Sequence, residues 1–280
     1  MLTFKYNLHG GSLTSIKVDG VEKLYQPMEN SWSGQDVVIF PFVARLKDKT
    51  YSHNGKIYTL LNHGVARYSD FNILKENENS VTLILESNEE TRKIYPFDFV
   101  LYVTYTAIGN ALEVEYKVHN TCKEKMYFGI GGHPAIKVDY ENNDTKRNYL
   151  RFENEMDLYY YTMDESYSFV GERKLLGRFK EIEMDKSFFK KYGTLLLDSK
   201  DIDKVYLYRK NGEIVEYCIE NRDFLAIWSH SYCGDYVCVE PWDSLPDFID
   251  ADKELKDKKT IKSLDQGKEY LFKYSIRFES

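Results

Sequence analysis

The sequence predicts an all-β protein, an antiparallel fold of sandwich or barrel type. Two-residue turns built from Asn, Asp and Gly are spread along the chain, several segments alternate between apolar and polar residues, and helical signals are sparse. Asn, Asp and Gly accept the positive φ that tight hairpin turns require. No linker rich in Pro, Gly or Ser divides the chain, so we expect a single domain over residues 1–280.

The individual elements follow from local patterns. Alternation with a period of two is the pattern of a strand with one wet face. The predicted strands include 80–85, 111–119, 205–208 and 270–279, and the predicted hairpin turns are Asp19-Gly20, Asn54-Gly55, Gly109-Asn110 and Asn211-Gly212. One short helix is expected over 185–191, capped by Asp185 or Ser187.

Composition limits the partners. The net charge is −7, and Lys and Arg are scattered among the acids, which argues against nucleic acid or an anionic membrane as the main partner. The start, "MLTFKYNLHGG", does not resemble a signal peptide, and no apolar run approaches the roughly 18 residues of a membrane span. We therefore expect a cytoplasmic protein, with the charged run 253–259 in a solvated loop.

The cysteines do not form a metal-binding pattern. Cys122, Cys218, Cys233 and Cys238 include no CxxC pair, and no histidine lies nearby at metal-ligand spacing. We expect free thiols, although Cys233 and Cys238 could approach each other. The sequence thus predicts neither a metal nor an organic cofactor.

A carboxylate interrupts an apolar strand in "YVCVEPWDSLPD" (236–247). Val237, Cys238 and Val239 predict a buried strand, and Glu240 follows directly. An ionised carboxylate in an apolar environment is costly unless it has partners. Glu240 is therefore expected to face a partner or a ligand.

A histidine lies at a second interruption, in "FGIGGHPAIKV" (128–138). Gly131 and Gly132 allow a bulge or a close approach of the backbone to another group, and Pro134 removes a ladder donor. His133 between them is either a satisfied core histidine or a site residue.

A third stretch, "FPFVARLKDKTYSHNGKIYTLLNHGVAR" (40–67), adds two arginines and a histidine. Arg45 interrupts an apolar run, His63 precedes Gly64, and Arg67 follows four residues later. Arg45 could instead pair with a structural acid, and Arg67 could be an ordinary surface residue.

Glu240 and His133 can form an acid–base pair. With reference pKa values of about 4.3 and 6.5, the glutamate can rest ionised as the base while the histidine, its pKa slightly raised, serves as the acid. The sequence has no GxSxG, HExxH, P-loop or GxGxxG motif. A glycosidase would need a second acid, for which Asp243 and Asp247 are the candidates.

Together, the three stretches resemble the aldose 1-epimerase (galactose mutarotase) superfamily over essentially the whole chain, and they are most similar to its LacX-like branch. The resemblance implies a large antiparallel β-sandwich of the galactose mutarotase-like type, with the sugar on the concave sheet. It implies that Glu240 is the general base and His133 the general acid, while Arg45 and His63 bind sugar hydroxyls. Here the histidine stands in Gly-His-Pro rather than Asn-His-Thr, and we take Asp247 for the aspartate with which the family grips substrate.

The resemblance implies an isomerase that interconverts the α and β anomers of an aldose by ring opening, as a monomer or homodimer. We expect Glu240 and His133 across one open cleft, far enough apart to admit the edge of a pyranose ring. The rate should fall at low pH as Glu240 protonates and at high pH as His133 loses its proton.

Two alternatives remain open. "HGVAR" is similar to the hexose-6-phosphate 1-epimerase branch, in which Arg67 would bind phosphate because guanidinium forks suit phosphate oxygens. The other is a non-catalytic carbohydrate-binding or sensing protein on the same fold. Such a protein would keep aromatic stacking surfaces such as Trp242 or Trp228 while the acid–base pair was misaligned.

Overall fold

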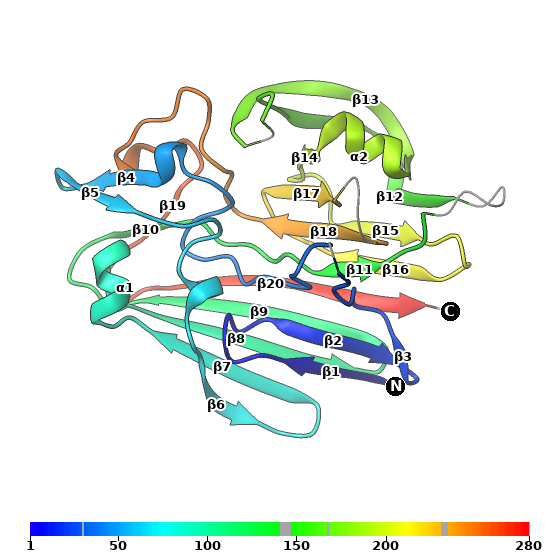
Figure 1. Ribbon diagram of the computed structural model, residues 1–280, viewed down its shortest axis with the longest axis horizontal. Helices are drawn as coiled ribbons and strands as arrows, with labels where there is room; N and C mark the ends of the chain where they lie inside the picture. The colour runs from blue at the N-terminus through cyan, green and yellow to red at the C-terminus, as the bar shows by residue number, and fades with distance from the viewer. Residues whose placement is uncertain (30, 141–146, 167, 231–234, 280) are drawn as a thin grey trace.

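The computed structural model describes residues 1–29, 31–140, 147–166, 168–230 and 235–279 (Figure 1). Strands account for 52% of the structure, and the strands within each sheet pair antiparallel. The all-β, antiparallel prediction is therefore confirmed.

The strands are distributed over the whole described chain. In chain order they are β1 Leu2–Tyr6, β2 Leu13–Val18, β3 Val21–Glu22, β4 Thr50–His53, β5 Lys56–Thr59, β6 Asn72–Glu76, β7 Ser80–Glu86, β8 Phe99–Ile108, β9 Ala111–Asn120, β10 Met126–Phe128, β11 Ala135–Lys137, β12 Asn148–Met163, β13 Val170–Met184, β14 Thr194–Asp198, β15 Lys204–Tyr208, β16 Ile214–Cys218, β17 Phe224–Trp228, β18 Tyr236–Trp242, β19 Lys262–Leu264 and β20 Glu269–Glu279. The α-helices are α1 Glu89–Ile94 and α2 Lys186–Tyr192, and short 3₁₀ turns cover Lys47–Lys49, Ala66–Tyr68 and Leu255–Asp257.

One 13-stranded sheet dominates the molecule. Its order is β11-β18-β17-β14-β12-β15-β16-β20-β9-β8-β7-β6, and β13 pairs with β12 beside this path. In Figure 1, β6 to β9 and β20 form the lower layer, while β12 and β14 to β18 lie above them. The small sheet β1-β2-β3 lies against the lower layer, and one apolar core cluster includes side chains from Leu2 to Phe278.

The predicted turns join the strands as expected. Asp19-Gly20 joins β2 to β3, Asn54-Gly55 joins β4 to β5, Gly109-Asn110 joins β8 to β9, and Asn211-Gly212 lies between β15 and β16. Both residues of the first two turns have positive φ, between 49° and 81°. This is the backbone conformation for which the Asp-Gly and Asn-Gly pairs are suited.

The period-2 segments place their apolar residues in the core. In β9 the residues Leu112, Val114, Tyr116 and Val118 are buried, and the residues between them are less buried. The same alternation recurs in β20, which pairs with β9 from Glu269↔His119 to Arg277↔Ala111. The register therefore follows the hydrophobic pattern.

The predicted helix is present as α2. Its N-cap is Asp185, whose side chain accepts a hydrogen bond from the Phe188 backbone N–H at 2.7 Å. The charged run 253–259, by contrast, is not wholly solvated. Lys258 is buried, because its ammonium group forms an ion pair with the buried Asp247 at 2.6 Å.

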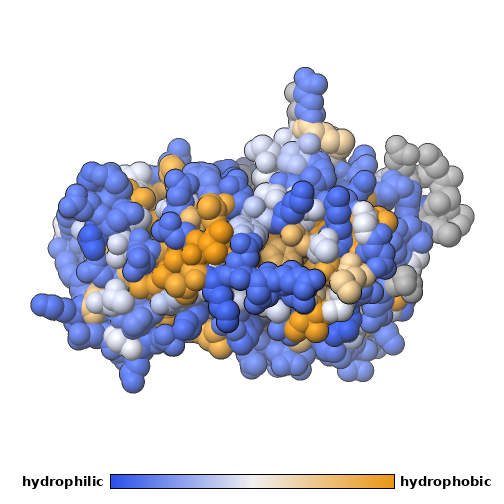
Figure 2. All heavy atoms as spheres, turned by 90° about the horizontal axis from the view of Figure 1, so that it is seen from below, coloured by the Kyte–Doolittle hydropathy of each residue, from blue (hydrophilic) through white to orange (hydrophobic). Residues whose placement is uncertain are grey.

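No helix among the described residues is long and apolar enough to cross a membrane. Seen from below, the molecule presents a mostly hydrophilic face with separate hydrophobic areas (Figure 2). Strand β6, at the edge of the main sheet, exposes Ile73 and Leu74.

Candidate active site

Strand β18 carries Glu240 in its interior rather than at its end. It pairs with β17 in the register Ala226↔Glu240, and it continues to Trp242. The sequence predicted that the buried strand ends before Glu240, and this predicted end is too early. Because the whole strand is buried, the Glu240 side chain is held at the floor of the site, with 1% of its surface exposed.

His133 lies where strand pairing is interrupted, as predicted. Gly131 forms isolated bridges to Ile39 and Trp242, and regular pairing resumes only at Ala135. A Cβ on Gly131 would lie 2.4 Å from the Trp242 ring, and one on Gly132 would lie 2.5 Å from the Tyr274 hydroxyl. The two glycines thus permit the close approach that brings His133 to β18.

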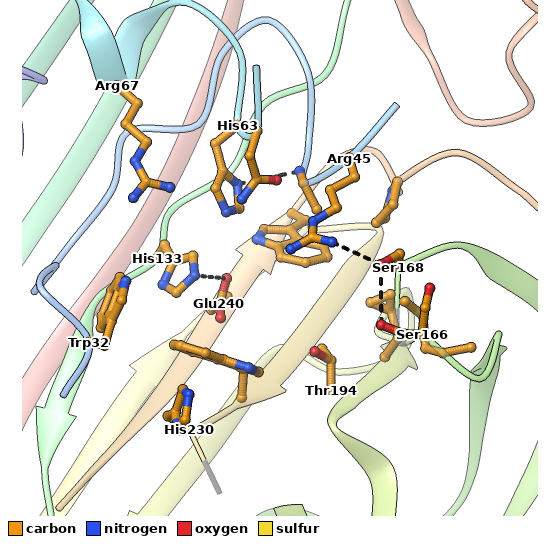
Figure 3. A pocket seen from close by; sticks show the side chains of 17 residues that line it. Trp32, Arg45, His63, Arg67, His133, Ser166, Ser168, Thr194, His230 and Glu240 are labelled. Carbon is orange, nitrogen blue, oxygen red and sulfur yellow. Dashed lines mark hydrogen bonds and ion pairs between the residues drawn. The ribbon is translucent and has the colours of Figure 1, made fainter. Parts of the chain in front are cut away.

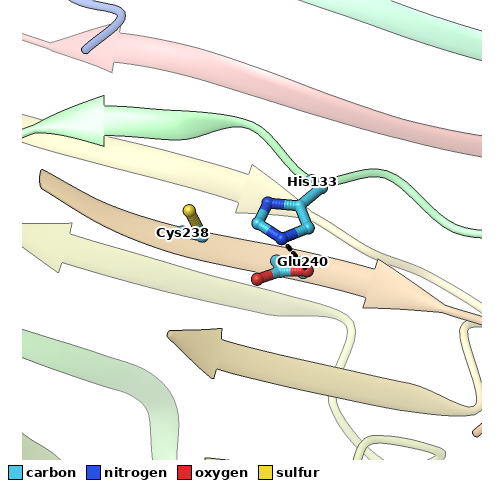
Figure 4. A group of neighbouring side chains, drawn as sticks. All are labelled: His133, Cys238 and Glu240. Atoms are coloured by element: carbon cyan, nitrogen blue, oxygen red, sulfur yellow. Dashed lines mark ion pairs between the residues drawn. The ribbon is translucent and has the colours of Figure 1, made fainter. Parts of the chain in front are cut away.

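His133 and Glu240 are brought into direct contact. Nε2 of His133 lies 3.3 Å from Oε2 of Glu240 (Figures 3 and 4). Among the described residues, neither His133 Nδ1 nor Glu240 Oε2 has a hydrogen-bond partner of good geometry. The expected gap for the edge of a pyranose ring is therefore not present between them.

Burial reverses the expected order of proton affinity in this pair. It lowers the pKa of His133 to about 3 and raises the pKa of Glu240 well above its usual range. The nearby Trp242 side chain opposes the rise at Glu240, and the Arg67 charge adds to the fall at His133. The expectation of an ionised glutamate beside a histidine of slightly raised pKa is thus wrong. The pair holds its proton on the glutamate.

The pair borders a cavity of about 320 Å³. Ligand pockets for small molecules commonly fall between about 300 and 1,000 Å³. Six of the seven predicted site residues line this cavity, namely Arg45, His63, Arg67, His133, Glu240 and Trp242. It therefore unites side chains from the three sequence stretches.

His63 projects a hydrogen-bond donor toward the cavity. The Ala44 backbone N–H donates to His63 Nδ1 at 3.3 Å, so the proton of the neutral ring is on Nε2. Burial lowers the pKa of His63 well below its usual value, and His133, Arg67 and Arg45 add to this fall. His63 is therefore a neutral donor, which suits a sugar hydroxyl.

Two guanidinium groups border the cavity without a carboxylate partner among the described residues. Arg45 donates from Nη1 to Ser168 Oγ at 3.1 Å, and Arg67 lies over the Tyr68 ring. Neither alternative raised by the sequence, a structural ion pair for Arg45 or an ordinary surface position for Arg67, describes these side chains. In Figure 3 they lie on opposite sides of His63.

Aromatic rings enclose the histidine. The Trp32 ring centroid lies 5.1 Å from that of His133, tilted by 32°, and the Trp228 centroid lies 5.6 Å away at 75°. Both indoles line the cavity and can supply an apolar surface for a sugar face. Sequence reasoning missed Trp32 and Ser168, because each comes from a segment with no other site signal.

Asp247 does not border the cavity. One of its oxygens accepts from Lys258 Nζ at 2.6 Å and the other from the Lys47 backbone N–H at 2.9 Å. Its carboxylate is therefore already occupied, and the expectation that it grips substrate is corrected to a structural role. Asp243 is also engaged, by Arg222 and Tyr270, so neither candidate second acid of a glycosidase faces Glu240.

Cys238 lies beside the pair on the same strand (Figure 4). The nitrogen, sulfur and oxygen of His133, Cys238 and Glu240 lie within 4.8 Å of one another, a donor set also found around zinc. We assign no metal to them. Cys233 lies outside the described residues, so its expected approach to Cys238 is not described.

Comparison with known proteins agrees with this geometry. The family model for aldose 1-epimerase matches residues 2–277. The chain is 29% identical over 273 residues to the chromosomal LacX protein of Lactococcus lactis, which covers 93% of this chain and 91% of that protein.

Two solved structures are similar over nearly their full length. A galactose mutarotase related enzyme from Lactobacillus acidophilus superposes with a TM-score of 0.94 at 30% identity, covering 100% of this chain and 95% of that chain. A galactose mutarotase-like protein from Lactobacillus casei gives 0.93 at 23% identity, covering 99% and 97%, and supports the fold. The antiparallel β-sandwich, the cavity at its strand interruptions and these matches lead to one conclusion: the chain belongs to the aldose 1-epimerase family.

Proposed function

We propose that the protein is an aldose 1-epimerase that interconverts sugar anomers through the His133–Glu240 pair. The observation that carries the proposal is the contact of 3.3 Å between the imidazole and the carboxyl group at the border of one cavity. His63 and the two arginines add hydrogen-bond donors for the sugar hydroxyls. Fold alone would not support an activity, but this arrangement of an acid–base pair and donors does.

The proposed reaction needs one proton on the pair. Transfer of the proton from Glu240 to His133 gives a carboxylate and an imidazolium, which is the reactive form. Glu240 then accepts the proton of the O1 hydroxyl, O1 forms the carbonyl, the C1–O5 bond breaks, and O5 receives the proton of His133. The pair again holds one proton, now on Glu240.

Ring closure is the reverse of these steps. Rotation about C1–C2 presents the other carbonyl face to O5, His133 takes back the O5 proton, and Glu240 returns its proton to O1. The charge state favoured by burial, with a protonated Glu240 and a neutral His133, is the one that accompanies the open-chain sugar. Positioned acid–base groups of this kind contribute about 10²–10⁴-fold each.

The test is the rate at which pure α-D-glucose and α-D-galactose mutarotate in the presence of the protein, followed by polarimetry. We expect an acceleration that is proportional to protein concentration and about 10²–10⁴-fold weaker in Glu240→Gln. Sugar binding without any acceleration above the buffer rate would support the sugar-binding or sensing alternative instead.

The second candidate is a hexose-6-phosphate 1-epimerase. Its support is that Arg45 and Arg67 border the cavity without a carboxylate partner among the described residues. Their positions on opposite sides of His63 favour separate contacts with hydroxyls over a shared phosphate site (Figure 3). We therefore place free aldoses ahead of hexose 6-phosphates.

A further inference from the structure

Asp36 is a buried carboxylate in the segment that pairs with the His133 segment, and no sequence pattern singled it out. Its side chain is buried with 4% exposure, and the Leu13 backbone N–H donates to its Oδ2 at 3.0 Å. In the described part of the chain Asp36 forms no ion pair, and its Oδ1 has no hydrogen-bond partner. Burying an acid without a cation costs stability, so this position is a candidate for a functional role.

The backbone ties Asp36 to the segment that carries His133. Ile39 and Gly131 exchange both backbone hydrogen bonds, with N···O distances of 3.0 and 3.2 Å, and the Ala135 N–H donates to the Gln35 carbonyl at 2.9 Å. Asp36 and His133 therefore lie between these backbone hydrogen bonds, on two paired segments. Burial raises the pKa of Asp36, and the backbone N–H groups of Leu13, Val37 and His133 oppose this rise.

We propose that Asp36 is a positioning residue: it fixes the backbone segment that carries His133, and its buried negative charge acts on Glu240. The proposal rests on the proposed function for its effect on catalysis, but not for its effect on Glu240. The groups that face Asp36 from the packed elements are Tyr105 of β8, Tyr116 of β9, Tyr274 of β20, and Cys238 and Glu240 of β18. None of them carries a positive charge that would offset the carboxylate.

The electrostatic effect has a definite direction. Burial is the main cause of the raised pKa of Glu240, and the Asp36 charge adds to it. The pKa of Asp36 itself is raised to about 6, chiefly by burial, so the residue is ionised at neutral pH. Removing this negative charge should therefore lower the pKa of Glu240.

Asp36→Asn separates charge from shape. The amide oxygen can still accept from the Leu13 backbone N–H, and the amide has nearly the same size and shape as the carboxylate. Because the native environment disfavours the ionised acid, the variant should fold. Asp98→Asn is the matched control, since Asp98 is half-exposed and binds Arg92 away from the cavity.

The experiment follows the Glu240 carboxyl by ¹³C NMR as pH is varied, with no sugar present. In Asp36→Asn the midpoint should fall by on the order of one pH unit, as expected for the loss of a neighbouring like charge. Asp98→Asn should leave it unchanged, and Asp36→Glu should restore it. An unchanged midpoint in Asp36→Asn, or an equal fall in Asp98→Asn, overturns the proposal.

Two further readouts complete the test. In the wild type, the Glu240 signal should show a second inflection at the pH where the Asp36 carboxyl titrates, and a single-site curve would overturn the proposal even if the variant did not fold. If the protein proves inactive on sugars while the Glu240 midpoint moves, the proposed function fails and the electrostatic role of Asp36 stands. In an active protein, the alkaline limb of kcat/KM should move with the midpoint.

Discussion

Nε2 of His133 lies 3.3 Å from Oε2 of Glu240, although the two residues come from stretches far apart in the sequence. A pyranose ring cannot pass between atoms at this distance. Because both residues border the same cavity, a sugar meets them from one side and can contact each group through a different oxygen. The contact also explains how one proton can be shared in the free protein.

The first prediction concerns the pair itself. Glu240→Gln keeps the shape of the side chain but removes the base, so sugar should still bind while mutarotation slows by about 10²–10⁴-fold. His133→Asn should slow the reaction similarly. The double variant should lose much less than the product of the two losses, because residues that act as a unit are strongly non-additive.

Polarimetry and calorimetric sugar binding measure these effects. The matched control is Glu216→Gln, whose carboxylate pairs with Lys204 away from the cavity. Full activity in Glu240→Gln would show that the wrong pair has been named.

The pH profile should reflect the reversed proton affinities. The pair holds one proton between the pKa of His133, lowered to about 3, and the raised pKa of Glu240. We therefore expect no loss of kcat/KM on acidification through the range where an ordinary histidine would titrate, and a fall at alkaline pH as the shared proton is lost. The two limits belong to the coupled pair rather than to either residue alone. A fall on acidification centred near 6.5 would contradict this assignment.

Arg67 allows a test of substrate class. If free aldoses are the substrates, Arg67→Ala should weaken binding of glucose and of glucose 6-phosphate by similar factors, because one hydroxyl contact is lost in each case. Arg45→Ala serves as the comparison on the other side of His63. Much higher efficiency on glucose 6-phosphate in the wild type, lost selectively in Arg67→Ala, would support the hexose-6-phosphate alternative.

Asp247 should prove structural. Removing one partner of a buried ion pair costs about 3–5 kcal/mol, so Asp247→Ala should lower the unfolding temperature strongly through its loss of Lys258. Asp250→Ala, which breaks only the exposed pair with Lys259, should change it little. Thermal unfolding and sugar KM separate the two roles. A raised KM with an unchanged unfolding temperature would return Asp247 to the substrate site.

The single domain over residues 1–280 remains a proposal that proteolysis can test. The core cluster draws side chains from both ends of the chain, from Leu2 to Phe278. Cleavage in an exposed loop should therefore yield fragments that stay associated or unfold together. Two stable halves, separable without denaturant, would show independent domains.

The sequence by itself determined the strand pattern and most of the site. Hairpin turns such as Asn54-Gly55, and alternation such as that of β9, are local signals, because backbone φ preference and the period of two act over a few residues. Glu240 and His133 stood out because each breaks an apolar or regular stretch, and both lie at the cavity.

Only the tertiary structure decided which polar groups meet and how deeply they are buried. It pairs Asp247 with Lys258, places Trp32 against His133, and buries Asp36 without an ion-pair partner among the described residues. It also reversed the proton affinities of His133 and Glu240. Desolvation and pairing depend on atoms brought together from distant parts of the chain, and no local pattern encodes them.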